Sequence, residues 1–310
     1  MKALLWLPLL ALPIVYRGDV VLTICIFSFL LAMAAVSFTL VFGFTGQLSM
    51  FHAAAFGLAS YVTYLFVSRA HLPFWIALGP AMAMTVLLSL VVGTICFKFK
   101  LKAFYFAVVT LAFSELTRLL VLNWNDLTNG TLGLLVLEKP TVWVPGSGVL
   151  RIEGTIAWYY LSLVGLILTV GVCWLVLRSW IGRCFAAIRL DEDLAQTLGV
   201  DIFRYKLLSF TIANLLAALA GSFYGFYTGY IEPSYLSINQ GLDIIAMVLL
   251  GGRLSLSGPI VGAFVLTGLP HLIELSGEVR AMLYGVILIL SILVMPNGIV
   301  GSIAGWRRAA

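Results

Sequence analysis

Long apolar runs, repeated along almost the whole chain, are the feature that most restricts what this sequence can fold into. Most runs are close to 20 residues long, which is about the length that an α-helix needs to cross a bilayer. Because backbone polar groups inside a membrane must be hydrogen-bonded within the protein, such runs fold as helices. The runs are approximately 3–16, 20–44, 51–68, 72–97, 103–122, 155–177, 207–231, 240–252, 258–273 and 281–304. The sequence therefore predicts an all-α polytopic membrane protein with about eight to ten hydrophobic helices, since 3–16 and 240–252 are too short to span comfortably.

Composition supports a single membrane domain over residues 1–310. The chain is 62% hydrophobic and 10% charged, whereas a soluble domain averages about 25% charged residues. If Met1 is cytoplasmic and each run crosses once, twelve Lys and Arg residues lie on the cytoplasmic side and five on the other. This bias predicts cytoplasmic N- and C-termini. The net charge of +5 reflects the same bias, so we do not interpret it as affinity for nucleic acid.

The first apolar run also has features of a signal peptide, because Lys2 precedes it. A small-x-small cleavage site is missing, however, and Pro8 and Pro13 make the segment irregular. We therefore expect a first span that is retained in the mature protein.

One charged segment, residues 178–206, contains nine of the chain's 31 charged residues. Gly199 suits a helix C-terminus, and the acids at 191–193 suit the N-terminal turn of a short helix. An amphipathic helix lying on the bilayer is the alternative, but three consecutive acids are unfavourable beside a negatively charged leaflet. The segment is therefore predicted to be a cytoplasmic loop that docks a soluble partner. Its apolar residues at near-helical spacing are Phe185, Ile188, Leu194, Ala195 and Leu198.

A polar stretch at 43–59 interrupts what would otherwise be one very long apolar region. Its candidate functional residues are Gly43, Gly46, Gln47, Ser49 and His52. One interpretation is a break between half-helices that line a pathway, since irregular backbone at membrane depth survives only inside protein or beside water. The other is a tight cytoplasmic turn between two ordinary spans, with small residues that allow close packing. The sequence alone favours neither.

A second glycine-rich break lies at 250–263. Its candidate residues are Gly251, Gly252, Ser255 and Gly258, and Gly258-Pro259 is a typical helix start. Two glycine-interrupted segments, one in each half of the chain, predict broken half-helices and an internal pseudo-repeat. Only glycine, serine and other small residues match between the two breaks.

Three charged residues inside predicted spans are further candidates, because an intramembrane charge is a functional candidate by default. Glu115 and Arg118 are three residues apart and can pair on one helix face, and Asp243 lies just inside its own span. A structural ion pair that fixes helix packing is the alternative for the first two. Residues 123–156, the longest segment on the outer (periplasmic) side, are predicted to form turns and a short hairpin.

Catalytic and metal-binding patterns are missing from the sequence. No lysine is followed by Ser or Thr, which excludes a GxxxxGK[ST] phosphate loop, and neither HExxH nor GxSxG occurs. The four cysteines lack metal-ligand spacing. We therefore expect no catalytic residue, no metal site and no bound cofactor. The main alternative class is a secondary transporter that couples ions through Glu115 and Asp243; an integral membrane enzyme would need a paired nucleophile and base.

At five places the sequence resembles the permease subunits of bacterial ABC importers for branched-chain amino acids, specifically the M-type member of the permease pair. The matching segments follow the family's order and spacing, and few positions depart from its pattern. Ala103, Asp243, Leu254 and Ser257 differ from the usual family residues; the substitutions at 254 and 257 bear on the finer geometry of the second break and not on the family. The segments are 43–52 (GFTGQLSMFH), 101–115 (LKAFYFAVVTLAFSE), 128–133 (TNGTLG), 187–206 and 249–259 (LLGGRLSLSGP).

The resemblance implies that this chain is one permease of an ATP-driven importer in the bacterial inner membrane. The implied partners are a second homologous permease, two ABC ATPase subunits that bind ATP and magnesium, and a periplasmic solute-binding protein. The implied substrates are branched-chain amino acids, with urea, short amides or other small organic solutes as alternatives. By the resemblance, the loop at 178–206 docks into the ATPase through a short helix. The implied coupling residues are Asp193, Leu194, Ala195, Leu198 and Gly199.

Overall fold

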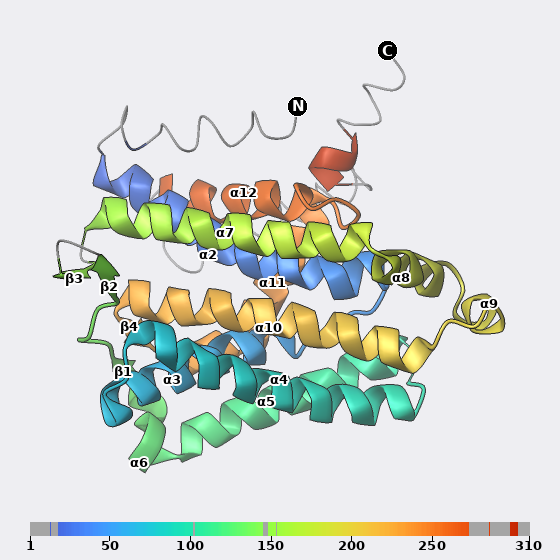
Figure 1. The fold of residues 1–310 in the computed structure, drawn as a ribbon, viewed down its shortest axis with the longest axis horizontal. Helices are drawn as coiled ribbons and strands as arrows, with labels where there is room; N and C mark the ends of the chain where they lie inside the picture. Colours follow the sequence, from blue (N-terminus) through green and yellow to red (C-terminus); the bar gives the residue numbers. More distant parts are fainter. Residues whose placement is uncertain are drawn as a thin grey trace.

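The computed structural model describes residues 18–101, 103–144, 148–152, 154–272 and 298–302, together with residues 13 and 285. Most of the long helices run side by side along one axis of a single bundle (Figure 1). The expected all-α polytopic membrane fold is confirmed. Most of the apolar runs 3–16 and 281–304, the two predicted terminal spans, lies outside the described residues. The helices long and apolar enough to cross a membrane in the described part are Asp19–Phe44, Phe74–Lys98, Phe104–Asn123, Thr155–Arg178 and Ile202–Thr228.

The secondary structure follows the apolar runs closely. The helices are α2 (Asp19–Thr39), the π-helix η2 (Leu40–Phe44), α3 (His52–Ala70), α4 (Phe74–Lys98), α5 (Ala103–Asn123), α6 (Asn125–Thr128), the 3-10 helix η3 (Gly130–Leu132), α7 (Thr155–Arg178), α8 (Trp180–Leu190), α9 (Glu192–Thr197), α10 (Ile202–Thr228), the 3-10 helix η4 (Pro233–Leu236), α11 (Ile238–Gly251) and α12 (Gly258–Leu272). The strands are β1 (Leu134–Leu135), β2 (Thr141–Val144), β3 (Gly148–Arg151) and β4 (Tyr230–Ile231).

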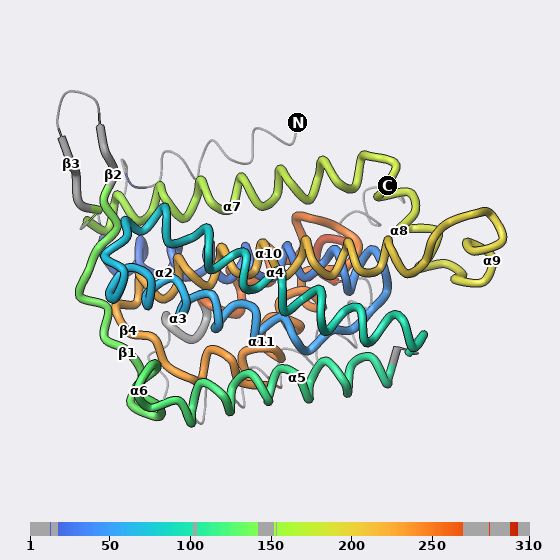
Figure 2. The backbone as a smooth tube through the Cα atoms, turned by 60° about the horizontal axis from the view of Figure 1, so that its bottom comes forward, coloured from blue at the N-terminus to red at the C-terminus, as the bar shows by residue number. Residues whose placement is uncertain are grey.

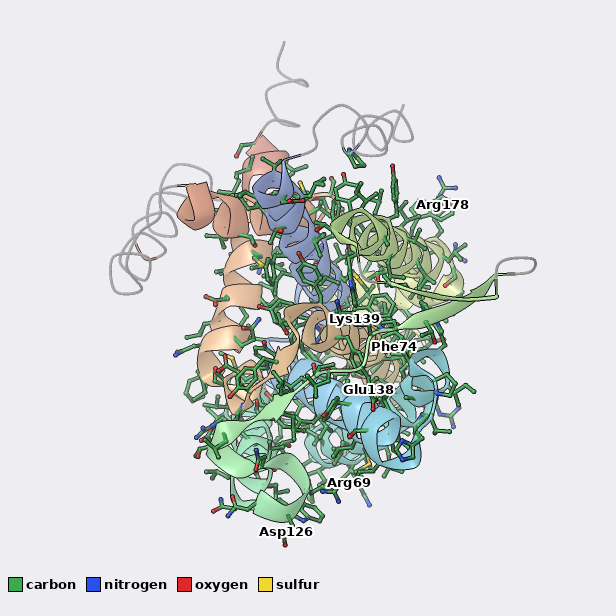
Figure 3. The ribbon with its side chains drawn as sticks, turned by 90° about the vertical axis from the view of Figure 1, so that its left-hand side faces the viewer. Arg69, Phe74, Asp126, Glu138, Lys139 and Arg178 are labelled. Carbon is green, nitrogen blue, oxygen red and sulfur yellow. The ribbon has the colours of Figure 1, made fainter. Side chains whose placement is uncertain are left out.

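The bundle has two distinct ends. Helices α8 and α9 project at one end, which we call the loop end (right in Figure 1). The opposite end, the hairpin end, carries α6 and two small antiparallel ladders, β1 with β4 and β2 with β3. The β2–β3 hairpin is the one that the turn-rich sequence at 123–156 predicts. Figure 3 looks at the hairpin end, where Arg69, Asp126, Glu138 and Lys139 lie.

Two helices, α2 and α10, form the centre of the bundle. Both are mostly buried, whereas α4, α5 and α7 are mostly exposed at the periphery. Helix α2 packs against α7, α10 and α12, and α10 packs against α3 and α4. Small side chains allow the closest of these contacts, such as the one between Thr63 and Ser222, whose hydroxyl oxygens are 2.8 Å apart. Helices α2 and α7 run from the hairpin end to the loop end, and α3 and α10 return (Figure 1).

Candidate functional site: a projecting loop and two glycine breaks

Helix α8 lies at the loop end with one face against the bundle. Ser179 caps its N-terminus, because its Oγ accepts a hydrogen bond from the Ile181 amide at 3.2 Å. Its packing partners are α7, α9, α10 and η2. Its opposite face carries the exposed side chains of Trp180 and Leu190. Helix α8 is therefore an amphipathic element held on the bundle. Its buried residues are Gly182, Cys184, Phe185 and Ile188.

Helix α9 begins at a capping aspartate. The Oδ1 atom of Asp191 accepts hydrogen bonds from the backbone amides of Asp193 and Leu194, at 2.9 and 3.0 Å. The cap satisfies two amides that have no partner within the helix. Glu192 and Asp193 occupy the first turn, where negative charge is favourable because the helix dipole is positive there. These contacts explain why six residues are enough to form a defined helix.

The C-terminus of α9 is closed by Gly199 in a Schellman motif. The Gly199 amide donates to the Gln196 carbonyl at 3.0 Å, and the Val200 amide donates to the Ala195 carbonyl at 3.1 Å. This geometry requires the left-handed conformation that Gly199 adopts, with φ of +85°. A Cβ added there would meet nothing within 4 Å, so within this chain the glycine is required by the backbone and not by packing.

We expect that Gly199→Val will unravel the last turn of α9, whereas Gly199→Asn will preserve it. A β-branched residue in the left-handed region costs about 1–2 kcal/mol, and asparagine tolerates that region better. Hydrogen exchange of the amides of residues 195–200 in detergent is the measurement. Equal protection in the two variants would contradict a backbone requirement at Gly199.

The exposed surface of α9 and its flanks is apolar. Leu190, Leu194 and Leu198 are spaced by four residues, and all three are largely exposed. Ala195 is instead buried on the inner side. Leu194 and Leu198 lie on one side of α9 and its C-cap, and Leu190 is the last residue of α8, before the extended cap Asp191; we call these three exposed leucines the leucine stripe. The loop tip is therefore a capped helix that ends in a Schellman turn and exposes leucines.

An ion pair joins α9 to the start of α10. The Nζ atom of Lys206 donates to Oε1 of Glu192 at 2.6 Å; the Lys206 side chain is 8% exposed and that of Glu192 is 51% exposed. A cavity of about 560 Å³ lies beside the pair, between the α4–α5 corner at Phe97, Lys100 and Leu101 on one side and α9 and α10 on the other. The pair is therefore a direct connection between the projecting helix and a central spanning helix. Sequence reasoning did not single out Lys206.

The first break, between α2 and α3, is a buried chain reversal. Helix α2 ends in the π-helix η2, and residues 45–51 are not helical. Thr45 Oγ1 donates to the Val41 carbonyl at 2.7 Å, which satisfies a carbonyl at the helix end. Gln47 and Ser49 are buried, whereas Gly46 is exposed. The chain therefore reverses direction between α2 and α3, and most of the reversal is enclosed by protein.

His52 joins three helices at this break. Its Nε2 atom lies 3.0 Å from the Ala34 carbonyl oxygen of α2 and 3.1 Å from Ser37 Oγ. Its Nδ1 atom lies 3.1 Å from the side-chain amide of Asn214 on α10. The Ala34 carbonyl can only accept, so a neutral ring with its proton on Nε2 requires that Asn214 turn its side-chain NH₂ group, in place of Oδ1, toward Nδ1. His52 is thus a buried cross-link with both ring nitrogens engaged.

The second break is a tight turn between α11 and α12. The Gly258 amide donates to Ser255 Oγ at 2.9 Å, and this starts α12. Gly252 has φ of +114°, and a Cβ on Gly251 would lie 1.8 Å from the Gly258 carbonyl oxygen. There is therefore no room for a side chain at Gly251. Helix α11 has only 14 residues, about 21 Å, which is too short to cross a bilayer and agrees with a half-helix.

The two breaks contact each other, and the first one also contacts α8. A Cβ placed on Gly43 would lie 1.9 Å from the Arg253 carbonyl oxygen. The Arg253 guanidinium lies 5.9 Å from the ring centre of Phe42, within cation–π range. A Cβ on Gly46 would lie 3.1 Å from Arg189 Cγ of α8. The structure therefore brings together three segments that the sequence singled out separately.

The intramembrane charges lie elsewhere. Arg118 Nε donates to both carboxylate oxygens of Glu115, at 3.0 and 2.9 Å, so the predicted pair is formed on α5. Asp243 is half-buried on α11, and no cation in the described part of the chain forms an ion pair with it. The described residues contain no group of His, Cys, Asp and Glu side chains that could hold a metal ion.

Sequence reasoning missed Asn214 and Gly262 as well as Lys206. A Cβ on Gly262 would lie 1.9 Å from the Met247 carbonyl oxygen, so Gly262 permits the close contact of α12 with α11. The spacing of Gly258 and Gly262 is a small-xxx-small pattern that would have indicated this contact. For Asn214, inside a long apolar run, no local signal indicates a histidine partner.

A bundle of long apolar helices with a capped, projecting loop beside two glycine turns has the architecture of a multi-pass membrane protein. The chain belongs to the family described as branched-chain amino acid transport system / permease component, whose family model matches residues 20–295. That match spans both glycine breaks and the loop.

Characterised relatives agree with this assignment. The chain is 26% identical over 303 residues to the high-affinity branched-chain amino acid transport system permease protein LivM of Escherichia coli K12, covering 92% of this chain and 70% of that protein. It is 26% identical over 296 residues to LivH, a permease protein of the same named system in that organism. This match covers 87% of this chain and 91% of that protein. The autoinducer 2 import system permease protein LsrC of Klebsiella pneumoniae is 31% identical over 147 residues, which cover 44% of this chain and 42% of that protein. No solved structure matches the chain significantly.

Proposed function

We propose that this chain is one permease subunit of an ATP-driven importer for branched-chain amino acids, or a related small solute, in the bacterial inner membrane. The observation that carries the proposal is the capped helix α9, which exposes leucines outward and is tied to α10 through Glu192 and Lys206. In this proposal, a partner ATPase binds α9 and displaces it. The sequence has no phosphate loop, so the ATP and magnesium belong to two partner ATPases.

The distribution of basic residues supports a cytoplasmic loop end. Among the described residues, positive charge gathers at that end, and cytoplasmic loops are rich in Lys and Arg. The loop end carries Lys98, Lys100, Arg178, Arg183, Arg189, Arg204, Lys206 and Arg253, whereas the hairpin end carries Arg69, Lys139 and Arg151. The hairpin end then faces the periplasm, where a solute-binding protein would deliver the substrate.

The contacts of the loop supply a route for coupling. Closure of the ATPase pair would displace α9, and the Glu192–Lys206 pair would pass the displacement to α10. Helix α8 would pass it to Gly46 and the first break, and the Gly43–Arg253 contact would pass it to the second break. Movement of the helices attached to these breaks would open the solute pathway to each side of the membrane in turn.

The test is co-purification of the ATPase with variants of the leucine stripe. We expect that Leu194→Asp and Leu198→Asp will abolish co-purification and ATP-dependent uptake of labelled leucine, because a buried carboxylate replaces an apolar contact. Leu137→Asp is the matched control, since Leu137 is also largely exposed and lies between β1 and β2 at the hairpin end. It is expected to retain the ATPase.

Two results would contradict the proposal. One is normal co-purification of the ATPase with the Leu194 and Leu198 variants. The other is ion-driven uptake by vesicles that contain this chain alone, which would identify a secondary transporter.

A further inference from the structure

The cavity at the loop end lies between two segments that are far apart in the sequence. One wall is the corner that joins α4 to α5, and the other is the segment that runs from α9 into α10. Figure 2 shows this corner and α9 at the same end of the bundle, on the right. The volume of about 560 Å³ is within the range of small-molecule sites, about 300–1,000 Å³. We call this space the corner cavity.

Lys206 brings an incompletely bonded ammonium group to the wall of the corner cavity. Its side chain is 8% exposed, and its Nζ atom donates one hydrogen bond, to Oε1 of Glu192. An ammonium group has three N–H donors, and the described residues supply no second acceptor for it. A nearly buried donor without an acceptor is unfavourable. The cavity therefore favours an occupant with oxygen acceptors, of which a carboxylate forms the strongest bonds to an ammonium group.

The other charges of the corner cavity include one cation and one anion that are not used within the chain. Two of its three acids, Glu192 and Asp201, already form ion pairs. Lys100 on the corner and Asp193 on α9 are exposed, and neither forms an ion pair in the part of the chain that the structure describes. The two lie on opposite walls. This arrangement is complementary to a ligand that carries one charge of each sign.

An apolar surface completes the corner cavity. Phe97 and Leu101 contribute to it from the corner, and Phe203 contributes from the start of α10. Phe97 is buried and the other two are half-buried. An aliphatic side chain placed against these residues would be removed from water, which is favourable. The ligand that fits all of these features is a small zwitterion with an apolar side chain.

We propose that the corner cavity binds an α-amino acid with an apolar side chain from the cytoplasm and that this binding inhibits import. The inference rests on the proposed function, which makes the loop end cytoplasmic and the imported solute an amino acid of this kind. The carboxylate accepts hydrogen bonds from Lys206 and Lys100, and the ammonium group pairs with Asp193. An occupant that contacts both walls holds α9 against the α4–α5 corner and opposes the displacement that the ATPase must produce. The accumulated solute thus slows its own import.

The experiment measures ATP-dependent uptake of labelled leucine into vesicles that contain the complete complex, with ATP in the lumen and the binding protein outside. The lumen corresponds to the cytoplasm and is loaded with unlabelled leucine, with isocaproate, which lacks the amino group, or with isoamylamine, which lacks the carboxyl group. With lumenal leucine at about ten times its inhibition constant, we expect initial uptake to fall about tenfold by mass action. The two analogues, with one charge each, should inhibit far less.

Lys100→Gln removes the unused cation from an exposed position. Lys98→Gln is the matched control, because Lys98 is an exposed lysine at the end of α4 that does not line the cavity. With an empty lumen, both variants should import leucine at the rate of the parent protein. The inhibition constant of lumenal leucine should rise about fivefold in Lys100→Gln, as expected for the loss of one exposed charge contact, and should be unchanged in Lys98→Gln.

A photoreactive diazirine analogue of leucine, which keeps both charges, gives a readout that does not depend on transport. In the solubilised complex we expect it to label residues 97–101 and 192–206, in competition with leucine and more weakly in Lys100→Gln than in Lys98→Gln.

Four results would overturn the inference: labelling confined to other segments, uptake that is insensitive to lumenal leucine, equal inhibition of the two lysine variants, and loss of the ATPase from the Lys100→Gln complex. The last would mean that the cavity receives a side chain of the ATPase. Absence of ATP-dependent uptake with an empty lumen would instead count against the proposed function, and labelling of the cavity would still be measurable.

Discussion

Replacing Gly43 with alanine is expected to separate the two glycine breaks and to abolish transport. The new Cβ would lie 1.9 Å from the Arg253 carbonyl oxygen and 2.8 Å from Thr39 Cγ2. The first contact is with backbone, which cannot rotate away as a flexible side chain would. Overpacking of this kind costs about 1–3 kcal/mol, and here relief requires that the α11–α12 turn move as a whole.

The matched control for this prediction is Gly79→Ala on α4. A Cβ at Gly79 meets nothing within 4 Å, and alanine is favoured over glycine in a helix interior by about 1 kcal/mol. We expect Gly79→Ala to unfold at the same temperature as the parent protein or slightly above it. Thermal unfolding in detergent and ATP-dependent uptake in vesicles are the two measurements.

A second variant separates the two contacts at Gly43. Thr39→Ser removes the Cγ2 atom but leaves the Arg253 carbonyl in place, so Gly43→Ala combined with Thr39→Ser should remain inactive. If Gly43→Ala behaves like Gly79→Ala in both measurements, the contact between the breaks has no role in the pathway that we propose.

Much of the fold could be predicted from local sequence signals. Apolar runs gave the spanning helices because a membrane leaves the backbone few alternatives. Asp191 and Gly199 indicated the ends of α9 because capping depends on the residues at the helix termini. Glycine and polar residues indicated both breaks because they interrupt long apolar runs.

Long-range contacts could not be predicted in this way. Gly43 was a candidate because it interrupts an apolar run, but nothing near it indicates that Arg253 supplies the neighbouring carbonyl. His52 was a candidate whose partner, Asn214, looks like an isolated polar residue in a span. Lys206 resembles an ordinary positive charge at the cytoplasmic end of a helix, and no local signal indicates that it is buried near α9 and the α4–α5 corner.

Neutralising Glu192 is expected to uncouple ATP hydrolysis from transport. In Glu192→Gln the ammonium of Lys206, 8% exposed, loses its ionic partner, while the leucine stripe that we propose to bind the ATPase is unchanged. Breaking a fully buried pair costs about 3–5 kcal/mol; because Glu192 is half-exposed, we expect about 1–3 kcal/mol here. The ATPase should still co-purify, but uptake per ATP hydrolysed should fall.

Two further variants distinguish transmission of force from simple stability. Lys206→Met removes the buried charge, so stability should be retained, yet α9 would lose its connection to α10 and uptake should fall as in Glu192→Gln. The charge-swapped double variant, Glu192→Lys with Lys206→Glu, should recover part of the uptake because it restores an attractive pair.

The exposed pair of Arg204 and Asp201 in the same loop provides the control. Its side chains are 83% and 46% exposed, and such surface pairs contribute about 1 kcal/mol or less. Arg204→Gln, which keeps Asp201 as the cap of α10, should therefore transport normally. Equal losses of uptake in Arg204→Gln and Glu192→Gln would mean that loop charge in general, and not the Glu192–Lys206 connection, sets the coupling. Normal uptake per ATP in Lys206→Met would also rule out that connection as the route by which α9 moves α10.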